Sequence, residues 1–388
     1  MKKKIIKCFL AITMFTLIVL SNSISSKATV STSLVNYAKS AILIEAETGE
    51  VLYEYNAHNR LEPASMTKVM TMKLVLDALK MKRITIDQEL TTSEHASQMG
   101  GTQIFLSPGE SMKVGDLLKS MVIASANDAA VSLAEGISGS ETFFVNAMND
   151  EIRKLGLKNT HYSNATGLPT DNHYTSCYDM AMVARNLLIN YEDEIIPYTS
   201  TYEDYVRKDS DKPFWLVNTN KLIKHVEGID GLKTGWTESA GYCLTCTKKV
   251  DGMRLITVVM NADTVSHRTI DTLALLNYGF ANYQKVEVIG KGEVIQESKN
   301  ILLKPTDYHI ITSNSISKVI KKNEKLSNIS QKVVIDEKAI TELNQYNVGI
   351  LEIYSNGLLI GSTELELSHK PIKNSFISLL LEVIKQIF

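Results

Sequence analysis

Ser65 and Lys68 are spaced as a nucleophile and its base. They lie three positions apart, directly after Pro63. Residues three apart share a face of a helix, so we expect the lysine amine beside the serine hydroxyl, where it can accept the hydroxyl proton. The start of a helix also offers unpaired backbone N–H groups for a developing oxyanion. The pair therefore predicts acyl transfer through a serine.

Two more motifs follow in chain order. Ser125-Ala-Asn127 lies between two helical stretches, and Lys233-Thr-Gly235 precedes a strand, with Gly231 and Gly235 allowing close approach of backbone to a ligand. Their first residues lie 60 and then 108 positions beyond Ser65 and Ser125. Similar spacings recur at Ser298–Asn300 and Ser315–Lys318. These copies fall in a β-rich stretch, so we interpret them as chance matches.

Strands and helices around these motifs predict an α+β domain. Hairpin signals at Thr48-Gly49 and Asp251-Gly252 separate runs of β-forming residues. Between them, apolar residues such as Met66, Val69 and Met70 recur with helical spacing after Pro63. The expected strands are 40–46, 50–55, 240–249 and 253–261, and the expected helices lie after Pro63, within 114–155 and over 268–283. We therefore expect a sheet closed by segments that are distant in sequence, with helices between them.

The predicted secondary structure of the sequence changes after about residue 284. Short β-type runs dominate, and Asn356-Gly357 between apolar runs indicates another hairpin. A chain of 388 residues has room for two or three domains. We therefore predict a catalytic domain over 29–283 and a separate β-rich domain over 284–370.

The first 28 residues have the pattern of an export signal. Lysines 2, 3, 4 and 7 precede the apolar run Phe9–Leu20, and Ser26-Lys-Ala28 supplies small residues before a cut. A permanent membrane anchor is the alternative, but the run is shorter than the ~20 apolar residues that span a bilayer. We expect cleavage near Ala28 and an exported protein.

Charge supports separating this segment from the rest. The whole chain has a net charge of −2, with 41 basic and 43 acidic residues. Residues 1–28 contain five of the lysines and no acid, so the remainder has 36 basic and 43 acidic residues, a balance of −7. This charge gives no case for nucleic-acid binding.

Residues 371–388 form a second unusual end. On a helical wheel, polar residues of 374–388 occupy one arc of about 120°, and apolar residues fill the remainder. Such segregation is typical of a helix lying in a membrane interface, and about 15 residues are too few to span. The alternative is a last helix docked on the core. We predict an anchor to the outer face of the cytoplasmic membrane.

Cysteine and histidine spacing predicts no metal and no redox site. Cys243 and Cys246 lie in a β-type run, where residues three apart face opposite sides, and no second pair exists to complete a zinc site. His58, His161 and His173 are scattered. We expect structural cysteines and no cofactor.

The three motifs together resemble the low-molecular-mass penicillin-binding proteins, the serine-type D-alanyl-D-alanine carboxypeptidases. The resemblance extends over roughly residues 35–283, through Pro63–Lys68, Ser125–Ala130, Asn164–Leu168 and Lys233–Gly235. It implies a DD-peptidase-like fold, an antiparallel sheet with flanking and inserted helices, followed by a small β-rich domain and an amphipathic helix. It also implies peptidoglycan stem peptides as substrates and β-lactams as covalent inhibitors.

The resemblance implies a role for each motif residue. Ser65 attacks the carbonyl between two D-alanines, Lys68 is the base, and Ser125 relays a proton to the leaving D-alanine. Asn127 orients the substrate amide. The substrate carboxylate meets a clamp formed by Lys233 and Thr234.

Further positions match the family less directly. The resemblance places the oxyanion between the backbone N–H groups of Ser65 and Trp236, next to Gly235. Arg268 aligns with a basic residue that helps to hold the carboxylate; a surface position is the alternative. Asp179 falls where the family keeps an acid near the active-site loop; a helix cap is the alternative.

Three other functions are alternatives to this one. A class A β-lactamase would add a glutamate base in Glu-x-x-x-Asn, and residues 130–230 contain no such spacing. A DD-endopeptidase uses the same residues and stays open. A catalytically idle cell-wall-binding protein would have no reason to retain a base, a relay and an anion clamp together.

Overall fold

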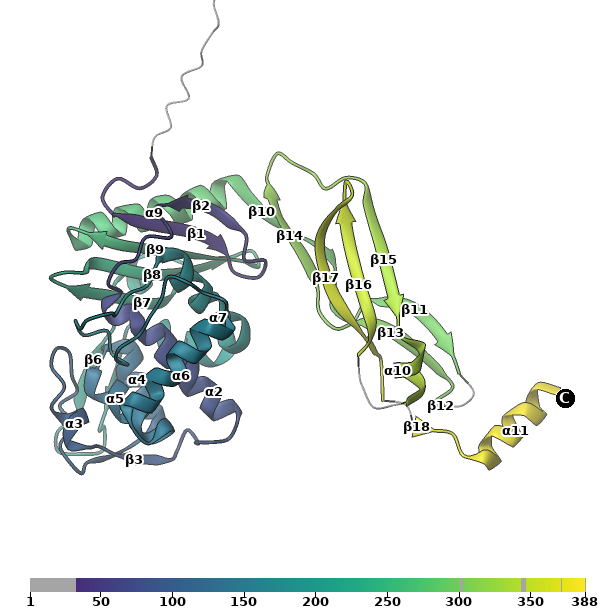
Figure 1. Ribbon diagram of the computed structural model, residues 1–388, viewed down its shortest axis with the longest axis horizontal. Coiled ribbons are helices and arrows are strands. Elements are labelled where there is room, and N and C mark those ends of the chain that lie inside the picture. Colours follow the sequence, from purple (N-terminus) through teal and green to yellow (C-terminus); the bar gives the residue numbers. More distant parts are fainter. Residues whose placement is uncertain (1–32, 301–302, 343–346, 371, 388) are drawn as a thin grey trace, which may run out of the picture. The chain divides into compact units, whose positions relative to one another are not determined.

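The computed structural model describes residues 33–300, 303–342, 347–370 and 372–387. The predicted signal peptide, 1–28, lies outside the described residues. Residues 35–282 form a mixed region of sheet and helices, and strands dominate the part that follows (Figure 1). The predicted α+β fold with a β-rich region after it is therefore confirmed.

A five-stranded antiparallel sheet organises the first region. Its order is β2-β1-β9-β8-β7, so β1 pairs with β9, which lies more than 200 residues later in the chain. The strands are β1 (Ser40–Glu45), β2 (Val51–Tyr55), β7 (Ile229–Thr237), β8 (Gly241–Val250) and β9 (Met253–Ala262). Distant segments close the sheet, as the sequence predicts.

Two-residue turns set the local register of the sheet. Asp251 and Gly252 both have positive φ, 48° and 76°, and join Val250 to Met253, which pair directly. This backbone suits the twist of a hairpin. The Asp-Gly signal therefore predicts β8 and β9 correctly.

The helices are inserted between β2 and β7, with one more after β9 (Figure 1). α7 and α9 both pack against β9, and every residue of β1 is buried, because helices cover both faces of the sheet. The helices are η1 (Ala64–Thr67, a 3-10 turn), α2 (Lys68–Lys80), α3 (Glu94–Ser97), α4 (Val114–Ile123), α5 (Asn127–Ser138), α6 (Glu141–Lys154), α7 (Cys177–Thr199), α8 (Leu222–His225) and α9 (Val265–Asn282). Short strand pairs lie among them: β3 (Glu89–Thr91) with β4 (Ser111–Lys113), and β5 (Glu203–Val206) with β6 (Phe214–Val217).

Side-chain caps begin several of these helices. Ser140 accepts a hydrogen bond from the Phe143 amide at the start of α6, and Thr264 does the same for His267 at the start of α9. Each cap satisfies a backbone donor that the helix itself cannot pair. The predicted helix over 268–283 is thus observed, with a start three residues earlier.

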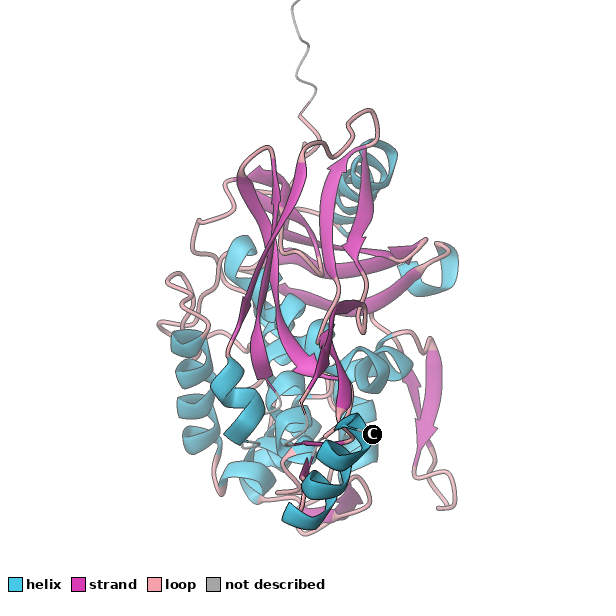
Figure 2. Cartoon of the chain, turned by 90° about the vertical axis from the view of Figure 1, so that its right-hand side faces the viewer, coloured by secondary structure: helices cyan, strands magenta, loops and turns pink. Residues whose placement is uncertain are grey.

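The region after α9 is built mostly from strands (Figure 2). β11-β13-β17-β16-β15 form a second antiparallel sheet, and β10 pairs with β14. Asn356 and Gly357, both with positive φ, form the predicted turn between β16 and β17. The elements are β10 (Tyr283–Ile289), β11 (Val294–Lys299), β12 (Leu303–Lys304), β13 (Asp307–Thr312), β14 (Ile316–Lys321), β15 (Ile329–Ile335), α10 (Glu337–Glu342), β16 (Asn347–Ser355), β17 (Leu358–Leu367) and β18 (Ile372–Lys373). This region has its own apolar core, which includes Ile310, Leu351 and Leu365.

The last element is helix α11 (Phe376–Ile387). Several of its apolar side chains are exposed to solvent: Phe376, Ile377, Leu380, Leu381, Val383 and Ile384. Among the described residues, no helix combines the length and apolar character needed to cross a membrane. The anchor stays a prediction.

Candidate active site

Ser65 lies in the 3-10 turn η1, and Lys68 is the first residue of α2. We expected both on one regular α-helix, and this expectation is wrong in detail. The i, i+3 proximity survives because side chains three apart eclipse one another in a 3-10 turn. The Lys68 Nζ lies 3.0 Å from the Ser65 Oγ.

The Lys68 amine is buried and has two other fixed neighbours. Its Nζ lies 2.6 Å from the Asn127 Oδ1 and 2.7 Å from the Thr166 carbonyl oxygen. Burial lowers the pKa of Lys68 well below its ordinary value of 10.5. The nearby positive charge of Lys233 lowers this pKa further, whereas Asp128 raises it.

These contacts define the direction of the amine lone pair. A neutral lysine amine has two N–H donors and one lone pair. The Asn127 and Thr166 oxygens can only accept, so they take the two N–H groups. The remaining direction faces the Ser65 hydroxyl. The arrangement therefore suits removal of the serine proton.

The Thr166 carbonyl is presented by a tight loop over 164–168. The Asn164 Oδ1 accepts hydrogen bonds from the backbone amides of Thr166 and Gly167. Gly167 has φ +85°, and a Cβ there would lie 1.8 Å from the Ala64 carbonyl oxygen. Only glycine permits this approach, so the loop packs directly against η1.

His173 also ties this loop to η1. The Ser163 amide donates to the His173 Nδ1, so Nε2 carries the ring proton and lies 2.8 Å from the Thr67 Oγ1. Burial lowers the pKa of His173 to about 4, with smaller effects from His161 and Lys68. His173 is therefore a neutral structural residue at neutral pH.

Ser125 and Asn127 lie at the junction of α4 and α5. Ser125 has φ +64°, an uncommon conformation for serine. The residue is largely buried, and its hydroxyl makes no hydrogen bond to another described residue. The Asn127 Nδ2 donates to the Gly100 carbonyl oxygen at 2.7 Å, which leaves one amide proton free. The junction therefore brings Asn127 to Lys68.

Lys233 and Thr234 lie at the middle of β7. Burial lowers the pKa of Lys233 to about 7, and the charge of Arg268 adds to this effect. The Thr234 hydroxyl donates to the Thr219 Oγ1 at 2.7 Å, and the Lys233 Nζ lies 3.5 Å from the same oxygen. A threonine outside the three motifs is therefore part of this cluster.

Gly235 and Trp236 bring β7 against the serine turn. A Cβ at Gly235 would lie 2.6 Å from the Pro63 carbonyl oxygen and 3.1 Å from the Ala64 Cβ. Trp236 is 58% exposed and borders a surface cavity of about 640 Å³. Its centroid lies 5.9 Å from that of Tyr242.

Arg268 is buried on α9, so the alternative of a surface position is wrong. Its Nη1 donates to the Cys243 carbonyl oxygen at 3.4 Å, and its Nε has no hydrogen-bond partner among the described residues. Burial lowers the pKa of Arg268. A buried cation with a free donor close to Lys233 favours an anionic ligand.

Asp179 lies in the first turn of α7 and does not contact the catalytic cluster through any described hydrogen bond. Its carboxylate accepts from the Asn159 amide at 2.7 Å and from the Thr160 hydroxyl at 2.9 Å. The helix cap is Ser176, which accepts from the Asp179 amide. Asp179 therefore fixes the segment that leads into the 164–168 loop.

Thr219, His173 and the Thr166 carbonyl are site residues that the sequence motifs miss. A single threonine in Asn218-Thr-Asn220 has no spacing signal, and a backbone carbonyl has no sequence identity at all. Thr166 alone could have been suspected, because it lies in Asn164–Leu168, a segment of the family resemblance.

The cysteines are buried thiols. Cys177, Cys243 and Cys246 form no disulfide, and burial raises the pKa of Cys243 to about 11 and that of Cys246 to about 12. In the described part of the chain, no three His, Cys, Asp or Glu side chains gather closely enough to hold a metal. The thiols thus have the character of packing residues.

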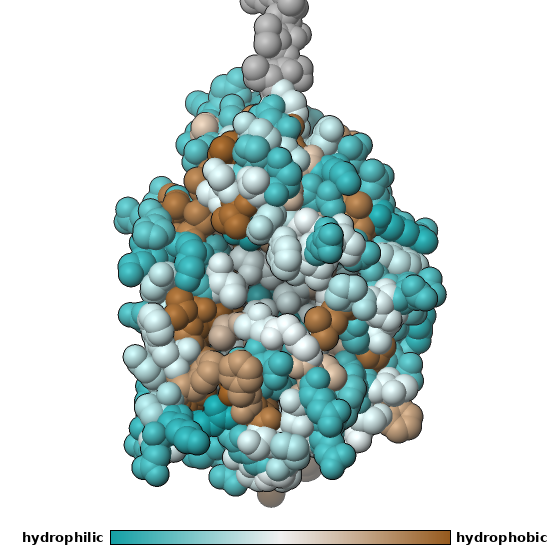
Figure 3. Space-filling view, turned by 90° about the vertical axis from the view of Figure 1, so that its left-hand side faces the viewer, coloured by the Kyte–Doolittle hydropathy of each residue, from teal (hydrophilic) through white to brown (hydrophobic). Residues whose placement is uncertain are grey.

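The molecular surface is hollowed on the face shown in Figure 3, with hydrophobic patches beside the hollow. Exposed apolar side chains of the first region include Phe105 and Trp236.

Residues 26–264 match the family of D-alanyl-D-alanine carboxypeptidases, peptidase S11.

Individual relatives agree with this match. The chain is 42% identical over 348 residues to the D-alanyl-D-alanine carboxypeptidase DacF of Bacillus subtilis, covering 89% of each protein. Penicillin-binding protein 5 of Haemophilus influenzae has a similar structure, with a TM-score of 0.69, 28% identity and coverage of 86% of this chain and 97% of that one.

A further similar structure contains an antibiotic. It is penicillin-binding protein D2 of Listeria monocytogenes in its ampicillin-bound form. The two chains are 33% identical, and the TM-score is 0.54, with coverage of 63% of this chain and 97% of that one. Since the family match covers more than half of the chain and the first relative covers nearly all of it, this protein belongs to the D-alanyl-D-alanine carboxypeptidase family, peptidase S11.

Proposed function

We propose that this protein removes the terminal D-alanine from peptidoglycan pentapeptide stems through an acyl-enzyme on Ser65. The observation that carries the proposal is the Lys68 amine, held by two acceptors with its third direction toward the Ser65 Oγ at 3.0 Å. A nucleophile beside a buried amine of lowered pKa is the arrangement that serine acyl transfer needs.

Acylation uses the serine turn and β7. Ser65 attacks the carbonyl between the two D-alanines as its proton passes to Lys68. The backbone N–H groups of Ser65 and Trp236 stabilise the oxyanion, and the close packing of Gly235 against Pro63 and Ala64 supports this pairing.

Release of D-alanine requires a proton at its nitrogen. The proton that Lys68 took from Ser65 passes through Ser125 to this nitrogen, and the unpartnered Ser125 hydroxyl at the α4–α5 junction, where φ is +64°, supports this role. Water then hydrolyses the ester with Lys68 as base, which restores the Ser65 hydroxyl and frees the shortened stem.

Three groups recognise the C-terminal carboxylate of the substrate. Lys233 and Arg268 supply positive charge, and Thr234 donates a hydrogen bond. Asn127 uses its free amide proton for the carbonyl of the substrate amide, since its other proton is already donated to Gly100. Asp179 acts at a distance, through the segment that carries Asn159 and Thr160.

The same geometry makes β-lactams covalent inhibitors of Ser65, in keeping with the ampicillin-bound relative. We place the enzyme outside the cytoplasm, after cleavage of residues 1–28, on the outer face of the cytoplasmic membrane. The exposed apolar side chains of α11 support attachment through 371–388.

Labelling with fluorescent penicillin tests the nucleophile. Wild type should be labelled covalently, and Ser65→Ala should not. Ser315→Ala is the matched control, because Ser315 and Lys318 repeat the same spacing on the other region, and it should be labelled as wild type is. Labelling that persists in folded Ser65→Ala would contradict the assignment.

A further inference from the structure

Thr219 lies at the meeting point of the two motif residues on β7. Its Oγ1 accepts a hydrogen bond from the Thr234 hydroxyl at 2.7 Å and lies 3.5 Å from the Lys233 Nζ. Thr219 itself is half-buried, at the edge of the cluster. It belongs to none of the three motifs and has no part in the proposed acylation or hydrolysis.

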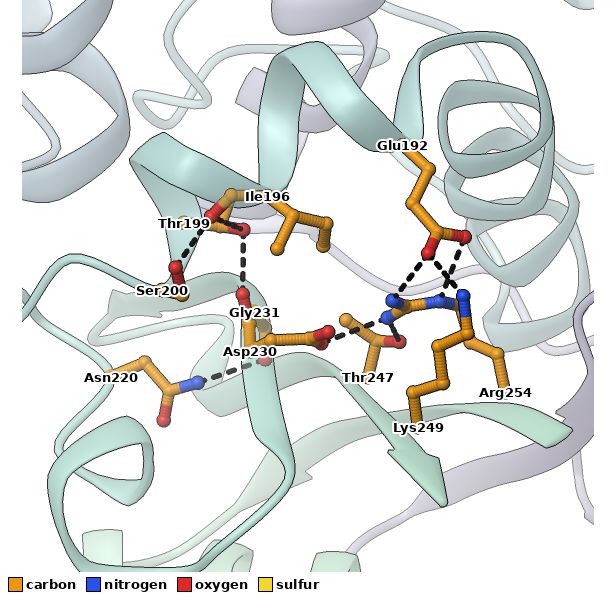
Figure 4. Close-up of polar contacts among 10 residues, drawn as sticks. All are labelled: Glu192, Ile196, Thr199, Ser200, Asn220, Asp230, Gly231, Thr247, Lys249 and Arg254. Atoms are coloured by element: carbon orange, nitrogen blue, oxygen red, sulfur yellow. Dashed lines mark hydrogen bonds and ion pairs between the residues drawn. The ribbon is translucent and has the colours of Figure 1, made fainter. Parts of the chain in front are cut away.

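The segment that carries Thr219 is held on both sides. The Asn218 side chain donates to the carbonyl oxygens of Thr199 and Thr201, at 3.1 and 2.9 Å. The Asn220 side chain donates to the Gly231 carbonyl oxygen at 3.0 Å (Figure 4). Both asparagines are buried. The hydroxyl between them is therefore fixed relative to the end of α7 and the start of β7.

The start of β7 is fixed as well. The Thr199 hydroxyl donates to the Asp230 carbonyl oxygen at 2.6 Å, and the Asp230 carboxylate accepts from Arg254 at 2.9 Å (Figure 4). Arg254 is buried and also pairs with Glu192 at 3.1 Å. Asp230 lies three residues before Lys233 and four before Thr234, so this network restrains the strand that carries them.

The direction of the Thr234 hydroxyl raises a chemical question. While it donates to Thr219, it has no proton to offer a carboxylate, because a hydroxyl has one donor. To donate to substrate it must rotate, and its oxygen then needs a donor in its place. The Thr219 hydroxyl can supply one, since it can accept from Lys233 and donate to Thr234 in turn.

We infer that Thr219 is a positioning residue for recognition of the substrate carboxylate. On binding, the hydroxyl pair reverses direction and forms a chain in which Lys233 donates to Thr219, Thr219 to Thr234, and Thr234 to the carboxylate. Hydrogen bonds in such a chain polarise one another. The inference rests on the proposed function, because it assumes that Lys233 and Thr234 bind the carboxylate.

The test compares two forms of one acylating agent, benzylpenicillin and its methyl ester, which lacks the carboxylate charge. The second-order rate constant for acylation is measured by intact-protein mass spectrometry, so only modified molecules are counted. Thr219→Val, which keeps the shape and removes the hydroxyl, should slow acylation by benzylpenicillin about tenfold or more. Acylation by the methyl ester should change less than about twofold, because no charged hydrogen-bond chain is lost.

Two further variants separate chemistry from structure. Thr219→Ser retains the hydroxyl and should restore the rate with benzylpenicillin. Thr257→Val is the matched control, since Thr257 is buried on β9 and its hydroxyl has no partner among the described residues; it should leave both rates unchanged.

The ratio of the two rates within one variant does not depend on how much protein is folded. The inference would be overturned if Thr219→Val slowed acylation by both compounds equally. It would also be overturned if Thr219→Val slowed acylation by neither compound. The proposed function is tested separately, by D-alanine release from a pentapeptide in wild type. Failure there would leave the penicillin ratio intact, so the two failures are distinguishable.

Discussion

Lys68, Lys233 and Arg268 are buried basic residues of the site, in a chain whose residues after 28 carry a net charge of −7. Burial lowers the pKa of each. The charge of Lys233 also lowers the pKa of Lys68, and the charge of Arg268 lowers that of Lys233. The cluster thus serves two needs, because a neutral Lys68 is a base, whereas a charged Lys233 attracts a carboxylate.

The pH dependence of kcat/KM should show both needs. The value should rise as Lys68 loses its proton and fall as Lys233 loses its own, and burial with the charge of Arg268 lowers the pKa of Lys233 to about 7. The arginine of Lys233→Arg keeps its charge at higher pH, so the alkaline limb of the kcat/KM profile should move to higher pH. The altered geometry should lower the activity at every pH.

Lys80→Arg is the matched control, because Lys80 is exposed at the end of α2. Its pH profile of D-alanine release from a pentapeptide should coincide with that of wild type. An alkaline limb that stays in place in Lys233→Arg would remove Lys233 from the account.

For single residues, the sequence predicts a contact where the separation along the chain alone brings two side chains together. The contact between Ser65 and Lys68 follows from a separation of three positions on one turn. Thr219 could not be predicted, because its contact with Thr234 depends on how Asn218 and Asn220 fold against other elements. A tertiary contact of this kind has no local signature.

The turn η1 packs closely against two neighbouring segments. On one side the 164–168 loop approaches through Gly167, and on the other β7 approaches through Gly235. The loop supplies the Thr166 carbonyl to Lys68, and β7 supplies Lys233 and Thr234. The position of the serine is therefore determined by the packing of three segments.

Gly167→Ala should be strongly destabilising. The residue has φ +85°, and its new Cβ would overlap the Ala64 carbonyl oxygen at 1.8 Å. Strain and overpacking together predict a loss of roughly 3 kcal/mol or more in the free energy of unfolding. Urea unfolding measures this quantity.

Gly156→Ala is the matched control. Gly156 also has positive φ, +69°, but nothing lies within 4 Å of a Cβ there. It should lose only about 1 kcal/mol, from backbone strain. Equal losses in the two variants would show that the contact with Ala64 does not matter.

The hairpins could be predicted because two-residue turns are local. Asp251-Gly252 and Asn356-Gly357 adopt the positive φ values that such dipeptides favour. The start of the catalytic helix was less predictable, since a 3-10 turn and an α-helix share the same i, i+3 pattern. The partners of the C-terminal strands could not be predicted from alternation alone, because alternation does not specify which strands pair.

At the scale of the whole chain, the family match covers residues 26–264, and α9, the β-rich region and α11 follow it in sequence. The exposed apolar side chains of α11 would be costly in water. Burial in a membrane interface removes that cost without requiring a helix that spans.

Deletion of residues 371–388 should separate attachment from catalysis. The truncated protein should leave the membrane fraction and retain pentapeptide hydrolysis, because the proposed catalytic residues all lie before residue 283. Sedimentation of membranes followed by immunodetection measures this. A truncated protein that still sediments with membranes would contradict the anchor.

Release of D-alanine from a defined pentapeptide stem, with a cross-linked stem dimer as a parallel substrate, shows directly whether the protein is a carboxypeptidase that acts through Ser65. Wild type should release free D-alanine from the pentapeptide, and Ser65→Ala should release none above background. Cleavage of the dimer without D-alanine release from the pentapeptide would instead indicate an endopeptidase. Absence of D-alanine release by folded wild type would contradict the account.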